Sequence, residues 1–179
     1  MTEIARIPDD SIDLMITSPA YIWIRDYGFE GQWGLENTID EYLGHLLAWM
    51  KEVKRVLKPT GSAVVNIGDT YGGGIVHSDW TPGPKSEGTK FPYSEERRNG
   101  MQFKRNIKKP HPNSLLFIPG QFGWRCVKEL NFTCHNFISW VKMSSMPFSG
   151  TNRFTNKYEP ILWFTKIPSG YYFDLDSVR

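Results

Sequence analysis

The sequence has few of the features that mark secreted, membrane or metal-binding proteins. Its 179 residues include two cysteines, Cys126 and Cys134, which are too few for a disulfide framework and fit no metal-ligand spacing. No segment reaches the roughly 20 apolar residues that span a bilayer, and the first residues lack a signal-peptide core. We therefore expect a soluble, cytoplasmic protein with reduced thiols, no metal site and no membrane partner.

The chain also has little net charge. The formal charge is +2, so binding to nucleic acid can be inferred only from where the basic residues lie. The four histidines, His45, His77, His111 and His135, are scattered, and we expect each to be structural or at the surface. A chain of this length suits one domain with a real core, so residues 1–179 are expected to form a single subdomain.

The first third of the chain has the pattern of a β-α-β unit. Residues Ser11–Thr17 are mostly apolar, as in a central strand covered on both faces. Thr38–Glu41 has the spacing of a capping box, and apolar residues then recur at helical intervals until Pro59 and Gly61. Ser62–Ile67 reads as a second buried strand, parallel to the first because such crossovers are right-handed.

The next segment, Tyr71–Asn113, is predicted to be a long mobile loop, most clearly over residues 72–113, because glycine and proline are frequent and aliphatic periodicity is missing. Its basic residues outnumber its acidic ones by four, with aromatic residues between them. The basic residues from His77 onward are Lys85, Lys90, Arg97, Arg98, Lys104, Arg105, Lys108 and Lys109. This composition fits either a solvated, partly disordered insertion or a segment that stacks on bases and neutralises phosphates.

The last third predicts one helix and two strands. Pro119–Leu130 has inward apolar positions at helical spacing, whereas Phe137–Val141 and Pro160–Thr165 are rich in residues that favour strands. The two strands are expected to pair antiparallel at one end of the sheet. The chain as a whole is therefore predicted to be an α/β protein.

A short turn, Thr17–Tyr21, ends the first predicted strand and carries the clearest chemistry. Ser18 offers a short hydroxyl, Pro19 leaves its carbonyl free and stiffens the turn, and Tyr21 offers a flat aromatic face. An exocyclic amine can donate to the first two groups while its ring stacks on the third. The turn by itself fits equally well an ordinary proline turn after a strand.

The neighbouring segments favour the chemical interpretation. Ser18-Pro19-Ala20-Tyr21 is followed by Arg25-Asp26-Tyr27-Gly28 and by Gly31-Gln32-Trp33-Gly34-Leu35. In this order the segments resemble the amino-directed DNA methyltransferases, in particular the cytosine-N4 branch. Val64-Val65-Asn66-Ile67-Gly68-Asp69 and Asn156-Lys157-Tyr158-Glu159-Pro160 resemble later segments of that family. One position departs from the pattern, because Ala20 stands where the family has a second proline.

The resemblance implies transfer of a methyl group from S-adenosylmethionine to the exocyclic N4 of a cytosine flipped out of double-stranded DNA. Ser18 and the Pro19 carbonyl would hold the amine, with Ala20 in the turn and Tyr21 stacked on the base. Asp69 either orients Ser18 and the amine or caps a turn. Arg25 either reaches a phosphate or pairs with a nearby carboxylate, Asp26 or Glu30.

Beside this resemblance, the basic loop is expected to contact DNA. The residues expected to do so are Arg97, Arg98, Lys104, Arg105, Lys108 and Lys109. Neither cysteine lies in a Pro-Cys nucleophile motif, which argues against methylation at cytosine C5. Catalysis is instead expected to depend on orientation and electrostatics, without a covalent intermediate.

The resemblance also indicates what the chain lacks. No glycine-rich turn of the Phe-x-Gly-x-Gly type occurs, and Gly72-Gly73-Gly74 follows the wrong strand. We therefore expect a partial Rossmann-like class I methyltransferase sheet: the catalytic-half strands with an antiparallel end strand, and the cofactor half absent. The edge at Ser11–Thr17 would then pair with a missing C-terminal half, with a complementing chain, or with a second copy.

Three other functions are open at this point. Adenine-N6 methylation differs little, although Ser18 favours cytosine because the adenine branch more often has Asp or Asn there. A catalytically silent DNA-binding or assembly subunit is favoured by Ala20 and by the absent cofactor half. Methylation of a protein side-chain amide uses a similar turn, but Ser18 and the basic aromatic loop count against it.

Overall fold

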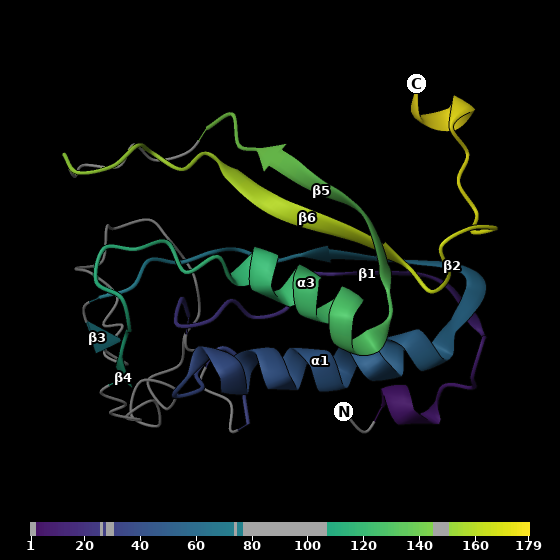
Figure 1. Ribbon diagram of the computed structural model, residues 1–179, viewed down its shortest axis with the longest axis horizontal. Helices are drawn as coiled ribbons and strands as arrows, with labels where there is room; N and C mark the ends of the chain where they lie inside the picture. Colours follow the sequence, from purple (N-terminus) through teal and green to yellow (C-terminus); the bar gives the residue numbers. More distant parts are fainter. Residues whose placement is uncertain (1–2, 26, 28–30, 74, 77–106, 145–150) are drawn as a thin grey trace, which may run out of the picture. The chain divides into compact units, whose positions relative to one another are not determined.

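A computed structural model describes residues 3–25, 27, 31–73, 75–76, 107–144 and 151–179 (Figure 1). The described elements, in chain order, are η1 (Ile4–Arg6), β1 (Ile12–Thr17), α1 (Ile39–Val56), β2 (Leu57–Asn66), β3 (Ile75–Val76), β4 (Ile107–Lys108), α3 (Ile118–Leu130), β5 (Thr133–Val141), β6 (Tyr158–Thr165) and η2 (Asp176–Val178).

The described chain divides into two compact units. We call the first the sheet unit; it comprises the described parts of Met1–Pro19, Leu43–Asp69 and Phe117–Arg179. The second, the loop unit, comprises the described parts of Ala20–Tyr42 and Thr70–Leu116. The division falls inside the turn that follows β1, between its second and third residues.

The sheet unit holds a four-stranded sheet in the order β1-β2-β6-β5 (Figure 1). Strands β1 and β2 are parallel, and β6 is antiparallel to both of its neighbours. These pairings confirm the predicted β-α-β unit and the predicted antiparallel pair at a sheet end. Within the described residues β1 is an edge strand, not an interior one, and Leu14 and Ile16 are 53% and 70% exposed.

Helices α1 and α3 lie on the same side of this sheet (Figure 1). Helix α1 connects β1 to β2 and α3 precedes β5, so both connections run in the same direction along the sheet, and right-handed connections then place both helices on one face. Phe122 of α3 meets Phe164 of β6 edge to face, with ring centroids 6.1 Å apart. A Cβ at Gly123 would lie 2.5 Å from Leu162, so glycine permits this close approach of helix and strand. The ammonium of Lys54 in α1 donates to the Leu130 carbonyl at the end of α3.

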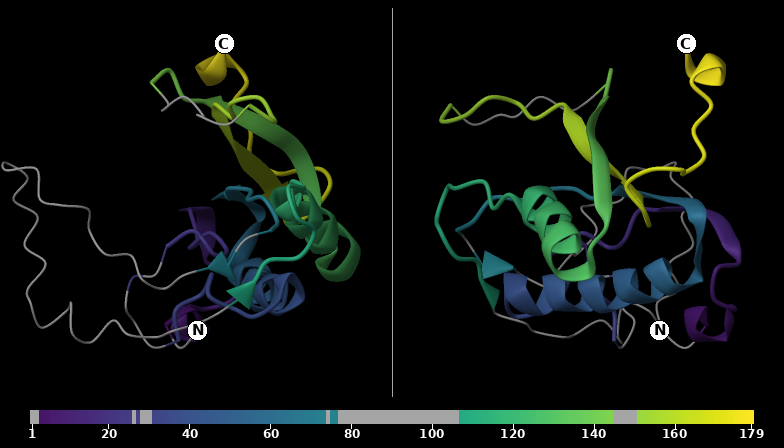
Figure 2. Two further views of the ribbon diagram at one scale, coloured as in Figure 1. Left: turned by 90° about the vertical axis from the view of Figure 1, so that its left-hand side faces the viewer. Right: turned by 45° about the vertical axis from the view of Figure 1, so that its right-hand side comes forward.

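Aromatic side chains gather on the other face of the sheet. Trp163 of β6 stacks on Phe173 at 5.1 Å and meets Tyr171 edge to face at 5.6 Å. The His135 ring lies 4.4 Å from the Tyr171 ring and 4.8 Å from the Trp163 ring. The segment after β6, coloured yellow in Figure 2, therefore packs back on its own sheet.

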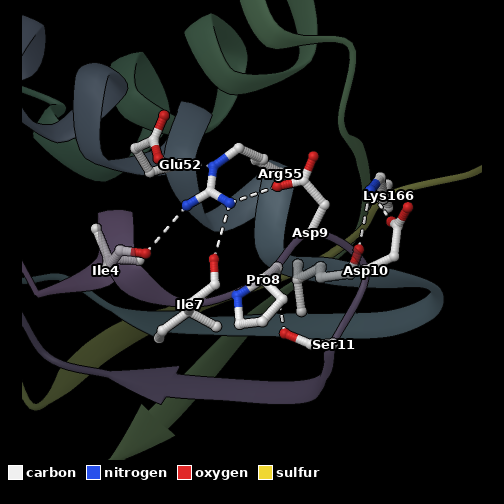
Figure 3. A network of polar contacts seen from close by, with 10 residues as sticks. Ile4, Ile7, Pro8, Asp9, Asp10, Ser11, Glu52, Arg55 and Lys166 are labelled. Atoms are coloured by element: carbon white, nitrogen blue, oxygen red, sulfur yellow. Dashed lines mark hydrogen bonds and ion pairs between the residues drawn. The ribbon is translucent and has the colours of Figure 1, made fainter.

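The start of the sheet unit is held by one guanidinium group (Figure 3). Arg55 of α1 donates to the backbone carbonyls of Ile4 and Ile7 at 3.0 and 2.9 Å. The same group pairs with Asp9 at 2.5 Å and with Glu52 at 2.8 Å. These bonds fix the chain that leads into β1 and so set the direction in which β1 enters the sheet.

Three predicted boundaries were wrong in detail. The helix that was predicted to end at Pro59 and Gly61 ends at Val56, and β2 begins at Leu57 instead of Ser62. The register shifts between Ile12 and Leu14, which lets this irregular segment pair with β1. Likewise β5 begins at Thr133, four residues before the predicted start, because pairing with β6 extends it.

The long loop is described only at its two ends. Ile75–Val76 and Ile107–Lys108 pair antiparallel, and Tyr71 forms a bridge with Leu115. Residues 77–106, including most of the predicted basic set, lie outside the described part of the chain. Among the helices that are described, none has the length and apolar character needed to cross a membrane.

Candidate active site

The first half of the Ser18–Tyr21 turn is positioned by strand register in the sheet unit. Thr17, the last residue of β1, pairs with Val65, so Ser18 and Asn66 come next on neighbouring parallel strands. The Ser18 hydroxyl donates to Oδ1 of Asn66 at 3.4 Å, and Nδ2 of Asn66 donates to the Pro160 carbonyl at 3.0 Å. The second bond sets the orientation of the amide and turns its oxygen toward Ser18.

Asn66 was not predicted as a site residue. The signal that points to it is a polar side chain at the carboxyl end of an apolar strand, one residue past the partner of Thr17. Ligands of open α/β sheets bind beyond the carboxyl ends of the strands. Finding Asn66 from sequence requires the register of β1 against β2, which is a tertiary property.

Asp69 caps a helix in the structure. Its Oδ1 accepts a hydrogen bond at 3.1 Å from the backbone N–H of Ile118, the first residue of α3. The residue that precedes this helix, Phe117, has a left-handed backbone and provides no side-chain cap. A carboxylate at the start of a helix satisfies an unpaired N–H and interacts favourably with the helix dipole. This contact is the capping role that the sequence left open for Asp69, at a helix instead of a turn.

The second half of the turn belongs to the loop unit and is held by different contacts. The Ala20 carbonyl accepts a hydrogen bond at 2.9 Å from the hydroxyl of Tyr42, which is fully buried. The next residues, Ile22 and Trp23, are also buried. The Trp23 indole donates to the Glu36 carbonyl at 2.7 Å, which ties the turn to the segment before α1.

Gly34 packs directly against the turn. Its φ is +89°, and a Cβ there would lie 2.8 Å from the Tyr21 carbonyl oxygen, so both conformation and space require glycine. Its carbonyl accepts from the Trp23 N–H at 2.6 Å, and its N–H donates to the Glu36 carboxylate at 2.7 Å. Gly34, in the Gly-Gln-x-Gly-Leu segment, therefore supports the second half of the turn.

The first turn of α1 places the Tyr42 hydroxyl. The predicted capping box is present: the Glu41 N–H donates to the Thr38 hydroxyl at 3.1 Å, and the Thr38 N–H donates to the Glu41 carboxylate at 3.2 Å. Burial raises the pKa of Tyr42, and the nearby Glu36 and Tyr21 raise it further. The hydroxyl therefore keeps its proton and serves as the hydrogen-bond donor to Ala20.

The structure describes three of the seven residues predicted to bind DNA. Arg25 is exposed, and its carbonyl accepts from the Gln32 amide at 2.8 Å. Lys108 contributes its backbone to β4, and Lys109 is partly buried, which lowers its pKa. Asp26 and Glu30, the alternative partners of Arg25, lie outside the described residues, as do Arg97, Arg98, Lys104 and Arg105.

Gly72 and Gly73, which follow β2, serve backbone packing. A Cβ at Gly72 would lie 1.9 Å from the Pro110 carbonyl oxygen, and one at Gly73 would lie 2.9 Å from Cα of Pro112. The N–H groups of both glycines are used by the Ser114 and Pro110 carbonyls. Gly72 and Gly73 therefore allow a close approach of backbone to backbone within the loop unit.

Both cysteines are unpaired thiols. Burial raises the pKa of Cys126 and, to a smaller extent, of Cys134. A buried thiol that holds its proton is not a nucleophile. No group of three or more metal-ligating side chains was found among the described residues.

The fold and the turn together define a class of protein. An α/β sheet with an antiparallel end strand carries a Ser-Pro-x-Tyr turn at the carboxyl end of one parallel strand and Asn66 at the end of the next. These are the features of an α/β methyltransferase that acts on an amino group.

Comparison with known proteins identifies the family within this class. The model of the N6 and N4 methyltransferase family, described as DNA methylase, matches residues 12–179. The Type II methyltransferase M.SfiI of Streptomyces fimbriatus is 34% identical over 176 residues, which are 98% of this chain and 36% of that protein. M.Cfr9I of Citrobacter freundii is 30% identical over 179 residues, which are 100% of this chain and 56% of that protein. The chain belongs to this DNA methylase family.

Solved structures share the fold. The PvuII DNA methyltransferase (cytosine-N4-specific) superposes with a TM-score of 0.63 at 20% identity, over 98% of this chain and 49% of that one. A DNA modification methylase of Thermus thermophilus, complexed with S-adenosyl-L-methionine, gives a TM-score of 0.56 at 23% identity, over 97% and 55%. The chain thus spans about half the length, or less, of the relatives it matches.

Proposed function

We propose that this chain is the catalytic half of a DNA methyltransferase that methylates the exocyclic N4 of cytosine, with S-adenosylmethionine as the methyl donor. The observation that carries the proposal is the Ser18–Asn66–Pro160 hydrogen-bond chain, which fixes a hydroxyl at the carboxyl ends of β1 and β2. Family membership supports methylation of an amino group in DNA. The choice of cytosine rests on Ser18 at the first position of the turn.

The proposed role of the turn is to hold an amine by its hydrogens. The Ser18 hydroxyl donates its proton to Asn66, and its oxygen is proposed to accept a hydrogen bond from the amine, as a hydroxyl can do both. The Pro19 carbonyl is the second acceptor, and the Tyr21 ring stacks on the base. Holding both amine hydrogens tilts the nitrogen lone pair out of the plane of the ring, toward the side from which a methyl group arrives.

The target base must leave the double helix to reach this turn. Unstacking a base costs a few kcal/mol, and stacking on an aromatic ring returns part of that cost. Contact with the DNA backbone is proposed for Arg25 and for the basic residues Arg97, Arg98, Lys104, Arg105, Lys108 and Lys109. Asp69, as the cap of α3, is proposed to support the pocket by fixing the chain after β2.

The methyl donor is proposed to bind mainly outside this chain. When bound, S-adenosylmethionine supplies an electrophilic methyl group. Among the described glycines, Gly72 and Gly73 approach neighbouring backbone so closely that they do not fit such a group. The partner that supplies the donor site is proposed to pair with the open edge of β1, where Leu14 and Ile16 are exposed. It is proposed to be either the remaining half of the same protein or a complementing chain, and a cytoplasmic location is proposed for the enzyme.

The test is to identify the modified nucleoside. The complete enzyme is supplied with labelled S-adenosylmethionine and double-stranded oligonucleotides, and the digested DNA is separated by chromatography with mass detection. N4-methylcytosine is the expected product. N6-methyladenine would replace the cytosine proposal with the adenine one, and salt-dependent DNA binding without any methyl transfer would identify a silent binding subunit.

A matched pair of serine variants separates the turn from the strand that carries it. Ser18→Ala is expected to lower kcat about 100-fold, the scale of a lost preorganised hydrogen-bonding group at a reacting centre. Ser11→Ala is the control, because Ser11 precedes the opposite end of β1 and its hydroxyl donates to the Pro8 carbonyl. Equal activity of the two variants would contradict the proposed role of Ser18.

A further inference from the structure

One buried side chain contacts the catalytic turn from within the loop unit. The Tyr42 hydroxyl donates to the Ala20 carbonyl at 2.9 Å, and Tyr42 has no exposed surface. That carbonyl belongs to the peptide that joins Ala20 to Tyr21, the residue proposed to stack on the base. A hydrogen bond to this oxygen therefore limits rotation of the peptide on which the ring is mounted.

Other contacts restrict this peptide and the one that follows it. The backbone of Gly34 approaches so closely that a Cβ would lie 3.3 Å from the Ala20 oxygen and 2.8 Å from the Tyr21 oxygen. The Ile24 N–H donates to the Tyr21 carbonyl at 3.4 Å, which closes a tight turn. The Tyr42 hydroxyl is the donor from α1, and the capping box of that helix fixes the turn on which it lies.

Ala20 is the position where such a restraint matters. Alanine leaves φ free, whereas a proline fixes it near −65°. Without a second restraint, the peptide before Tyr21 would sample more orientations, and the ring would be less often in the orientation that meets a base. The hydrogen bond from Tyr42 supplies this restraint through space.

We propose that Tyr42 is a positioning residue for methyl transfer: its hydroxyl fixes the Ala20–Tyr21 peptide and thereby the orientation of the Tyr21 ring. This inference rests on the proposed function. It adds a residue in α1 to the site, 22 positions from Ala20 in the sequence. Tyr42 acts through Ala20 and is not proposed to touch the substrate.

The first experiment measures the hydrogen bond itself and needs no activity. The alanines of the chain are Ala5, Ala20, Ala48 and Ala63, and only Ala20 precedes a tyrosine. Protein labelled with carbon-13 at the alanine carbonyl and nitrogen-15 in tyrosine therefore gives one carbonyl–amide correlation, from the Ala20–Tyr21 peptide. Loss of a donor moves a carbonyl carbon upfield, so Tyr42→Phe is expected to shift this signal upfield.

Two further variants are compared with Tyr42→Phe: one should shift the signal less, and one should not shift it. Thr38→Ala removes the capping hydroxyl of the turn that carries Tyr42, and it is expected to shift the signal in the same direction by less. It also keeps the test decisive if Tyr42→Phe does not fold. Tyr171→Phe removes a tyrosine hydroxyl that faces His135 in the sheet unit, and it should leave the signal unchanged.

The second experiment measures methyl transfer by the complete enzyme. Tyr42→Phe keeps the ring and removes only the oxygen, so we expect kcat to fall about tenfold, as for one neutral hydrogen bond. The KM for DNA should change less than twofold, because Tyr42 touches no substrate. Tyr171→Phe should leave both constants unchanged.

The outcomes separate this inference from the proposed function. An unshifted Ala20–Tyr21 signal in the Tyr42 variant, or an unchanged kcat in an enzyme whose parent is active, would overturn the inference. A rise in KM without a fall in kcat would also overturn it, since that indicates a role in binding. A parent enzyme with no methyl transfer contradicts the proposed function, while the carbonyl signal still decides whether Tyr42 restrains Ala20.

Discussion

The two halves of the Ser18–Tyr21 turn are held in different ways. Ser18 follows a β-strand, and its hydroxyl is set by the register of β1 against β2 and by the amide of Asn66. Ala20 and Tyr21 are held by a buried hydroxyl, a close glycine backbone and an indole hydrogen bond. One half relies on repetitive backbone pairing, and the other relies on a few individual contacts.

The difference indicates how each half should respond to substitution. A strand end is supported by many backbone hydrogen bonds, so removing one side chain weakens it by a limited amount. The loop half depends on contacts that have no substitutes, so one badly placed atom displaces the whole segment. The first two experiments below test this contrast, and the next two test the sheet unit that supports the strand half; the largest expected effect comes first.

Gly34→Ala should damage the loop half most. The added Cβ would lie 2.8 Å from the Tyr21 oxygen at a backbone φ of +89°, so overpacking and a left-handed alanine together cost about 3 kcal/mol. Gly31→Ala is the matched control, because Gly31 has φ of +74° with nothing within 4 Å and should cost about 1 kcal/mol. Urea unfolding measures both, and equal losses would show that space at Gly34 is not limiting.

Asn66→Ala should weaken the strand half by a smaller amount. The substitution removes hydrogen bonds to Ser18 and to the Pro160 carbonyl, which should cost about 2 kcal/mol of unfolding free energy. Methyl transfer should fall with it, since the Ser18 proton loses its acceptor. Asn156→Ala, which removes an exposed 3.4 Å acceptor for the Tyr158 N–H, is the control and should cost less than about 0.5 kcal/mol.

Two substitutions distinguish a capping role of Asp69 from a chemical role. Asp69→Ala removes the acceptor of the Ile118 N–H and should cost about 1 kcal/mol, whereas Asp69→Asn keeps an acceptor and should recover most of it. If capping is the whole role, Asp69→Asn also recovers methyl transfer. Recovery of stability without recovery of activity would assign Asp69 a part in the chemistry.

The pH dependence of stability should reveal the buried thiol of the sheet unit. Burial raises the pKa of Cys126 above its unfolded value near 8.5, so the unfolded chain loses this proton first. Stability from this group is complete below about pH 8.5 and declines as pH rises toward the folded pKa, by about 1 kcal/mol near pH 9. The free energy of unfolding is measured under reducing conditions below pH 8.5 and at pH 9. The loss of stability between the two pH values should be smaller in Cys126→Ala than in the parent protein. An unchanged slope in the variant would exclude Cys126 as its cause.

Local patterns were sufficient for much of the fold. The capping box at Thr38–Glu41 fixed the start of α1, and the apolar spacing after it identified the helix, although α1 ends at Val56, before the predicted stop at Pro59 and Gly61. The β-forming residues of β5 and β6 identified a strand pair, although pairing extended β5 beyond its predicted start. These features depend on residues within a few positions of one another, which is why sequence alone reveals them.

The site was only partly visible in the sequence. The Ser18–Tyr21 turn stands out because its residue types are contiguous, but its partners are distant: Asn66 is 48 residues from Ser18, and Tyr42 is 22 from Ala20. Asp69 bonds a helix 49 residues away. Such pairs are set by strand register and by side-chain packing, and neither leaves a local pattern.

The sequence by itself determined the family, the β-α-β order and the chemistry that the turn can offer. The tertiary structure decided that the turn is divided between two units, that Asn66 receives the Ser18 proton, and that Tyr42 holds Ala20. The reason is physical: residue type and spacing fix what a group can donate or accept, whereas only the folded chain brings a particular donor to a particular acceptor.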